Sequence, residues 1–198
     1  MNKAIILRST FGIWISIISW VIAVGVVISF FYAPDSSQLI LYIWPIALVC
    51  LLVWVMFWRP KLIIDEELIQ VINPLTEYRL NFSAVNRIDT KYTLTLFTAE
   101  HKITVWSAPA PSRYAILRMA KVEGQHLPES SYVANSIRPG DLPSSESGSA
   151  AIIVRRIWES KRDNNLLTET PQVAIRYNWY WVLAAAVLLL ATVIAPLF

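Results

Sequence analysis

Few side chains in this sequence are of the types that catalyse reactions or bind metals, and these few are scattered along the chain. There are two histidines, His101 and His126, and one cysteine, Cys50, and they do not stand at the spacings of metal ligands. The acidic run Asp65–Glu67 could bind a cation or act as an acid or base, but adjacent acids in a hairpin turn are usually solvated. We therefore predict no metal site and no cofactor.

Motifs for phosphate binding and for nucleophilic catalysis are also missing. The 198 residues include only five glycines, none in a phosphate-binding loop, and the sequence has no nucleophile elbow. We expect the protein not to be an enzyme. The net charge of +3 could suggest a nucleic-acid partner, but 15 of the 17 Lys and Arg lie in residues 59–176, mixed with most of the acids. We attribute this charge to membrane topology and predict no nucleic-acid binding.

Apolar residues make up 56% of the chain, and their excess is concentrated in three runs without charged side chains: 11–32, 39–58 and 178–198. A helix of about 20 residues crosses a hydrocarbon core of about 30 Å, so each run predicts a transmembrane helix. The first two form a hairpin within residues 1–58. Small residues that we expect at helix contacts are Ser16, Ser19, Gly25 and Ser29.

The basic residues near the ends of these runs predict their orientation. Positive charge is retained on the cytoplasmic side, and the loop 33–38 has none. The basic residues are Lys3, Arg8, Arg59, Lys61 and Arg176. We therefore predict a multi-pass protein of the cell membrane, with the N-terminus and the central domain in the cytoplasm.

Between the second and third spans, short runs rich in Ile, Val, Thr, Tyr and Phe predict six antiparallel strands. The runs are 61–65, 68–73, 76–82, 86–92, 94–99 and 101–108. Apolar and polar residues alternate in the last two, so each strand should bury one face. We predict that Trp106 anchors the core, and that a helical segment at 113–124 caps the open end of the strands.

This part of the chain is similar to the actinobacterial membrane proteins with a bacterial pleckstrin-homology-like domain, the low molecular weight protein antigen 6 family. The resemblance covers residues 39–120 and depends on RPKLIID after a span, INPL, YRLNFSAV, NRIDTKYTLTLFT and TVWSAPAPSR. It implies an α+β membrane protein in which residues 59–122 form a pleckstrin-homology-like antiparallel β roll with a C-terminal helix. Phosphoinositide-binding domains of this kind have a basic first hairpin, whereas KLIIDEELIQV is acidic at its tip, which argues against inositol lipids.

Residues 123–149 are rich in Ser, Pro and Gly and predict a flexible linker. Residues 150–163 predict an amphipathic helix, whose apolar arc could lie on lipid or pack on the β domain; the pattern alone leaves both open. Side chains that would contact an anionic membrane surface are Arg155, Arg156, Trp158, Lys161 and Arg162.

These features favour a membrane-anchored, non-enzymatic interaction or scaffolding protein that presents its β domain to an unknown membrane or cytoplasmic protein. Two alternatives stay open. One is a sensor of anionic lipid surfaces, and the other is an accessory subunit of a transporter or cell-envelope enzyme.

Overall fold

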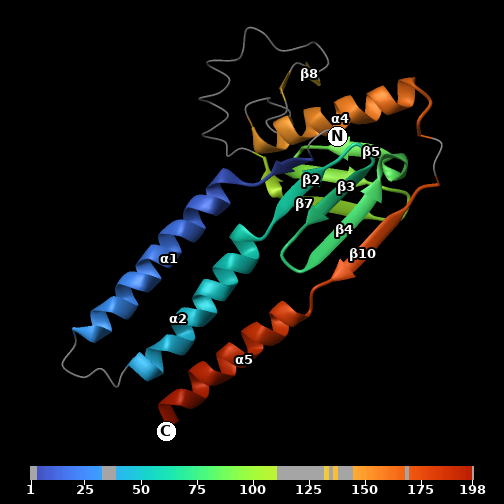
Figure 1. The fold of residues 1–198 in the computed structure, drawn as a ribbon. Coiled ribbons are helices and arrows are strands. Elements are labelled where there is room, and N and C mark those ends of the chain that lie inside the picture. The colour runs from blue at the N-terminus through green and yellow to red at the C-terminus, as the bar shows by residue number, and fades with distance from the viewer. Residues whose placement is uncertain are drawn as a thin grey trace.

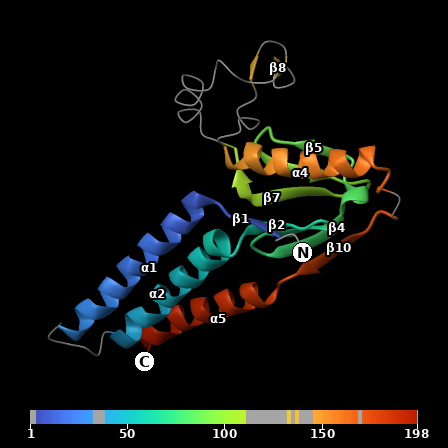
Figure 2. The same ribbon diagram turned by 45° about the horizontal axis from the view of Figure 1, so that its top comes forward.

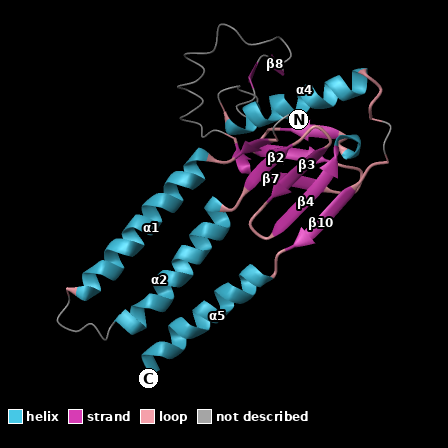
Figure 3. Cartoon of the chain, in the orientation of Figure 1, coloured by secondary structure: helices cyan, strands magenta, loops and turns pink. Residues whose placement is uncertain are grey.

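The computed structural model describes residues 4–32, 39–110, 132–133, 136–137, 145–167 and 170–197. As the sequence predicts, these residues form an α+β structure with three long apolar helices and antiparallel sheets. Figure 1 shows the three helices extending from one side of the β domain, and Figure 3 shows that the strands gather at the other end.

The three apolar helices lie in a row. They are α1 (Thr10–Phe31), α2 (Leu39–Val53), which continues as the π-helical η2 (Trp54–Trp58), and α5 (Tyr180–Ile194), which ends in the 3-10 turn η6 (Ala195–Leu197). Each of the three is long and apolar enough to cross a membrane, and few of their residues are buried within the molecule. The central helix α2 contacts both α1 and α5.

Small residues of α1 lie where it meets α2 and η2. Gly12 and Ser16 are buried, and the Ser16 hydroxyl donates to the Gly12 carbonyl oxygen at 2.9 Å. Ser19 lines a groove between α1 and α2. Gly25, by contrast, faces open space, and Ser29 is exposed. The predicted helix contact is therefore confirmed for Ser16 and Ser19. It is wrong for Gly25 and Ser29, which face away from the neighbouring helices of this chain, although the second half of α1 also contacts α2, where the Phe30 and Tyr42 rings stack 5.4 Å apart.

All six predicted strands are confirmed. They are β2 (Lys61–Ile64), β3 (Leu68–Ile72), β4 (Thr76–Asn81), β5 (Arg87–Asp89), β6 (Thr93–Phe97) and β7 (Lys102–Pro109). A 3-10 turn, η3 (Phe82–Ala84), links β4 to β5. The strands form two antiparallel sheets, one of which has the order β5-β6-β7. A separate two-stranded ladder joins β8 (Tyr132–Val133) to β9 (Ser136–Ile137).

The other sheet has five strands, because two further strands join β2, β3 and β4. These are β1 (Ile5–Leu7) and β10 (Val173–Tyr177), and the order is β1-β2-β3-β4-β10. The pairing is antiparallel throughout, with Leu7 opposite Leu62 and Tyr177 opposite Thr76. Residues from both ends of the chain thus extend the sheet beyond the predicted range 59–122.

The hydrophobic core lies between the two sheets and beneath α4 (Glu146–Asp163). Fully buried side chains from both sheets include Leu62, Ile69, Val71, Leu80, Leu94, Leu96, Ile103 and Val105. The apolar arc of α4 joins them through Ala150, Ala151 and Val154, all buried. This arc therefore packs on the β domain, which is one of the two alternatives that the sequence leaves open.

The helix α4 begins four residues before the predicted start at residue 150. Ser145 is its N-cap, and its hydroxyl oxygen accepts from the Gly148 N–H at 2.9 Å, which satisfies a donor that the helix itself cannot pair. In Figures 1 and 2, α4 and β10 lie on opposite sides of the β domain. The predicted cap at 113–124 lies outside the described residues, as does most of the predicted linker.

Candidate functional site at the junction of helices and sheet

Three strands of the five-stranded sheet continue into the three apolar helices through connections of two residues each. The connections are 8–9 between β1 and α1, 59–60 between η2 and β2, and 178–179 between β10 and α5. We call these three connections the junction. Two residues leave little freedom for an interdomain hinge, so the sheet and the helices form a continuous unit.

Arg59 fixes the second connection to the turn between β3 and β4. Its guanidinium donates to the backbone oxygens of Asn73 and Pro74, the latter at 2.8 Å, and to Glu77 Oε1 at 2.6 Å. The side chain of Arg59 is only 9% exposed and that of Glu77 is 17% exposed. Such a pair is short and charge-assisted, and removing either partner would leave a poorly solvated charge.

The third connection is held by the same carboxylate. Asn178 is buried, and its Nδ2 donates to Glu77 Oε1 at 3.2 Å. Its backbone N–H donates to the Leu75 oxygen at 2.8 Å. Glu77 therefore links the connection between η2 and β2 to the connection between β10 and α5.

The first connection is held by α4 and by an aromatic ring. The Thr10 N–H, at the start of α1, donates to Glu146 Oε1 at 2.5 Å. The Arg8 guanidinium lies 5.8 Å from the centroid of the Trp58 ring, a cation–π distance. The N-terminal turns of α1 and α4 are thus tied together.

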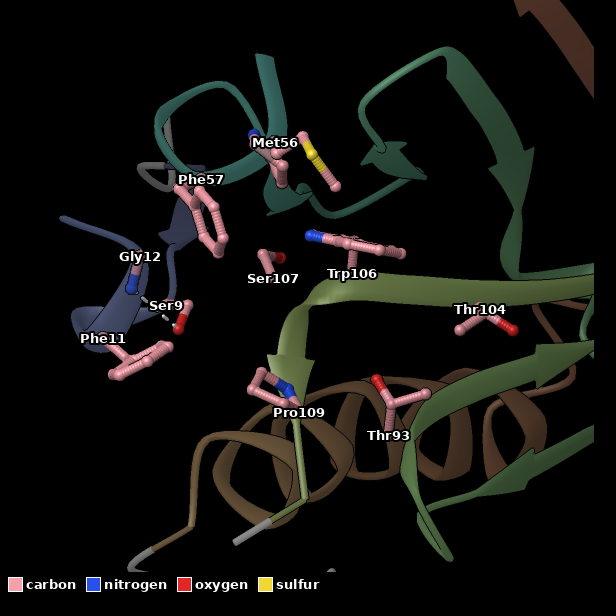
Figure 4. A pocket seen from close by; sticks show the side chains of 11 residues that line it. Ser9, Phe11, Gly12, Met56, Phe57, Thr93, Thr104, Trp106, Ser107 and Pro109 are labelled. Carbon is pink, nitrogen blue, oxygen red and sulfur yellow. Dashed lines mark hydrogen bonds between the residues drawn. The ribbon is translucent and has the colours of Figure 1, made fainter. Parts of the chain in front are cut away.

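A pocket of about 360 Å³ lies in the junction, between the first turn of α1, the end of η2 and strand β7 (Figure 4). We call it the junction pocket. Most of its wall is apolar. Its lining includes Phe11, Met56, Phe57, Trp106, Ser107 and Pro109.

Trp106 lines this pocket, and the prediction that it anchors the core is wrong. Ile103 and Val105 are buried, whereas the Trp106 side chain is 48% exposed. Alternation along β7 places Trp106 on the opposite face from these two residues. Its backbone N–H donates to Asn73 Oδ1 at 3.0 Å, which ties β7 to the turn that holds Arg59.

Ser107 is the unusual polar residue of the pocket. It is 2% exposed, and its hydroxyl has no hydrogen-bond partner among the described residues. In Figure 4 its side chain lies between those of Phe57 and Trp106. The Thr93 hydroxyl on the same wall is satisfied, since its oxygen lies 2.8 and 2.9 Å from two backbone oxygens of β7 and its single proton can be donated to either of them. A buried hydroxyl without a partner costs about 1–3 kcal/mol.

The structure does not gather the five predicted surface residues of α4 into one patch. Arg155 and Trp158 line a small hollow beside β5. Arg156 and Lys161 line a wider groove on the other side of the helix. Arg162 points to Asp163, with Nε and Oδ1 3.2 Å apart. Membrane contact by these side chains stays a prediction. The apolar arc is engaged elsewhere, because Ala150, Ala151 and Val154 are buried in the core and Ile153, Ile157 and Trp158 pack against it.

The acidic turn lies opposite two of these basic residues. Asp65 and Glu66 are exposed and line the same groove as Arg156 and Lys161. The Glu66 N–H donates to Asp65 Oδ1 at 2.8 Å, a local contact typical of a turn. In the part of the chain that the structure describes, no three His, Cys, Asp or Glu residues group as a metal site.

Sequence reasoning missed both Glu77 and Ser107. The inward position of Ser107 follows from the alternation of Ile103 and Val105, so the pattern of β7 could have identified it. For Glu77 no signal exists, because its partners come from segments far apart in sequence. Comparisons of the chain with protein-family models, with curated proteins and with solved structures find no match in any of the three.

Proposed function

We propose that this protein is a membrane-anchored, non-enzymatic interaction protein, which holds its β domain rigidly at the cytoplasmic face and presents one sheet edge to a partner protein. Three apolar helices of membrane-spanning length on one side of the β domain support the membrane anchor. The two-residue connections of the junction support rigid presentation. Basic residues near the helix ends support the orientation.

We also propose that the domain is a pleckstrin-homology-like roll related to the actinobacterial family named above. Two antiparallel sheets with a helix packed beside them support this assignment. Strands β1 and β10 lie outside the predicted range 59–122, and they join the sheet directly to α1 and α5.

The observation that carries the interaction proposal is the outer edge of β10. The five-stranded sheet ends at this strand, and no described strand pairs with its other side. The Gln172 oxygen accepts from Asn81 N–H at 3.3 Å, and the Asn178 N–H donates to Leu75. Backbone groups alternate between the two edges of an antiparallel strand, so those of Val173, Ile175 and Tyr177 point away from β4.

This edge is open to addition of a strand from another chain. Exposed edges are usually blunted by Pro, by a bulge or by short length. β10 has five residues in regular register with β4 and contains no Pro. An extended segment of a partner can pair with such an edge through main-chain hydrogen bonds.

A second copy of this chain is a poor occupant of the edge. In Figures 1 and 2, β10 runs in nearly the same direction as α5, into which it leads. Antiparallel pairing of two β10 strands would therefore direct the two sets of apolar helices oppositely, which one bilayer cannot accommodate. We propose an extended segment of a different protein at the membrane surface.

The proposal is tested in cells with a photoreactive amino acid in place of the exposed Ala174 of the full chain. We expect a specific crosslinked protein. Ile175→Pro removes an outward N–H and leaves the pairing with β4 intact, because Pro is tolerated at an edge strand. Ile175→Thr keeps the N–H and is the matched control.

We expect the crosslink to persist in Ile175→Thr and to be lost in Ile175→Pro, with similar thermal unfolding midpoints for both. A crosslink that survives the proline, or the absence of any crosslink from Ala174, contradicts the edge proposal. Crosslinks found only from a probe at Gly25, which faces open space, would favour the accessory-subunit alternative instead.

A further inference from the structure

We propose that the junction pocket binds the acyl-ester portion of a bilayer lipid, with the Ser107 hydroxyl donating a hydrogen bond to the ester carbonyl oxygen. This inference rests on the proposed insertion of α1, α2 and α5 in a membrane. It concerns a different surface from the β10 edge. Its support comes from the position, the wall and the polar groups of the pocket.

The position of the pocket matches the boundary between acyl chains and headgroups. The pocket lies where α1 begins and η2 ends, at the end of the apolar helices that joins the sheet. Arg8 and Arg59 occupy this level, and so do Trp58 and Trp179. Basic and amphipathic aromatic side chains collect at the interface of a bilayer.

The wall of the pocket suits an aliphatic chain. Phe11, Met56 and Phe57 contribute apolar side chains, and Pro109 closes one side (Figure 4). The volume of about 360 Å³ lies within the range of about 300–1,000 Å³ that small-molecule pockets have. A lipid next to the protein could insert part of one chain without leaving the bilayer.

The polar groups of the pocket call for a ligand that accepts hydrogen bonds. The buried Ser107 hydroxyl has no partner among the described residues. The indole nitrogen of Trp106 lies on the side of its ring that faces Ser107 in Figure 4. A hydrogen-bond acceptor held beside Ser107 would satisfy the buried hydroxyl, and the Trp106 indole N–H, which can only donate, suits a ligand of the same kind.

The charge around the pocket favours a neutral acceptor. The N-terminus of a helix such as α1 usually attracts anions. Here, however, the Glu146 carboxylate already accepts from the Thr10 N–H at 2.5 Å. A lipid phosphate in the same place would meet a like charge. An ester carbonyl has the required lone pairs without that repulsion.

The test uses the full chain in nanodiscs of phosphatidylcholine, part of which carries a photoreactive diazirine on the acyl chain close to the ester. Adducts are mapped by mass spectrometry. We expect adducts on Met56, Phe57 or Trp106, in addition to those on the outer faces of the helices. Ser107→Ala should reduce the pocket adducts about 2- to 10-fold, which is the effect of one hydrogen bond.

Two further variants complete the test. Ser107→Phe should fill the pocket and abolish these adducts. Ser29→Ala is the matched control, because Ser29 is exposed on α1 and its hydroxyl bonds to its own helix. Thermal unfolding of each variant shows whether it is folded. If Ser107→Phe does not fold, the result for Ser107→Ala alone tests the proposal.

Helix adducts without pocket adducts overturn the lipid site and leave the membrane proposal intact. Pocket adducts that do not change in Ser107→Ala also overturn it, because the hydroxyl would then have no role. Absence of adducts on all three helices would contradict membrane insertion itself, and the lipid site with it.

Discussion

Arg59 and Glu77 form an ion pair with Nη2 and Oε1 2.6 Å apart, which fastens the end of the second apolar helix to the second turn of the sheet. The same Glu77 oxygen accepts from Asn178, one residue after β10. Two of the three connections between helices and sheet therefore depend on a single carboxylate. We expect it to be a main determinant of the fixed orientation of the β domain.

Glu77→Gln should lower the stability of the protein measurably. The change removes the negative charge and leaves Arg59, which is 9% exposed, without its counterion. Breaking a buried pair costs up to about 3–5 kcal/mol. Glu66→Gln, at the exposed acidic turn, is the control and should have little effect. Thermal unfolding in mild detergent measures both, and equal midpoints would show that the pair contributes nothing.

Gly12→Ala should separate α1 from η2. A Cβ atom at position 12 would lie 2.8 Å from the backbone oxygen of Phe57, which cannot move aside as a flexible side chain could. Gly25→Ala is the matched control, because a Cβ atom at position 25 would meet no heavy atom within 4 Å beyond those of its own helix. Ala is favoured over Gly in a helix by about 1 kcal/mol, so Gly25→Ala should be neutral or stabilising. If both variants melt alike, the close approach at Gly12 is not important.

Trp106→Ala should destabilise the domain much less than a core substitution does. Trp106 is 48% exposed, whereas Phe82 is buried between the sheets and α4. Phe82→Ala should cost about 3–5 kcal/mol, as is typical for a large buried aromatic. Chemical denaturation of the two variants compares them. An equal or larger loss of stability in Trp106→Ala would show that Trp106 is an anchor of the core.

Val154→Asp should detach α4 from the sheets, because it places a charge where the side chain is fully buried. Ile152→Asp changes the neighbouring exposed face of the same helix and is the control. Limited proteolysis should cleave the first variant within 145–167 and leave the second resistant. Resistance of Val154→Asp would mean that the apolar arc of α4 has a different partner, and lipid would again be a candidate.

The β strands within 61–108 could be predicted from sequence because their β-branched residues, alternation and turns are local signals. Strands β1 and β10 could not. Ile5–Leu7 is three residues long, and Val173–Tyr177 directly precedes the aromatic start of α5, so each resembles the flank of a span. Both are strands because a partner strand in the middle of the chain pairs with them.

The junction pocket was beyond prediction for a related reason. Its wall combines the first turn of α1, the end of η2 and part of β7, which are separated by about 40 residues or more. The basic residues at the helix ends suggested membrane topology, but nothing local showed that Arg59 also binds Glu77. Alternation placed Trp106 opposite Ile103 and Val105, and this pattern predicted its exposure better than its size did.

The most direct test of the account is the topology of the chain in intact cells. Cys50 is the only cysteine, so Cys50→Ser gives a background for single-cysteine variants. Glu66→Cys places a thiol at the exposed turn of the β domain, and Leu197→Cys places one at the far end of α5. An impermeant maleimide should label Leu197→Cys in intact cells, and should label Glu66→Cys only after the membrane is permeabilised. Labelling of Glu66→Cys in intact cells, with Leu197→Cys protected, would contradict the cytoplasmic position of the β domain.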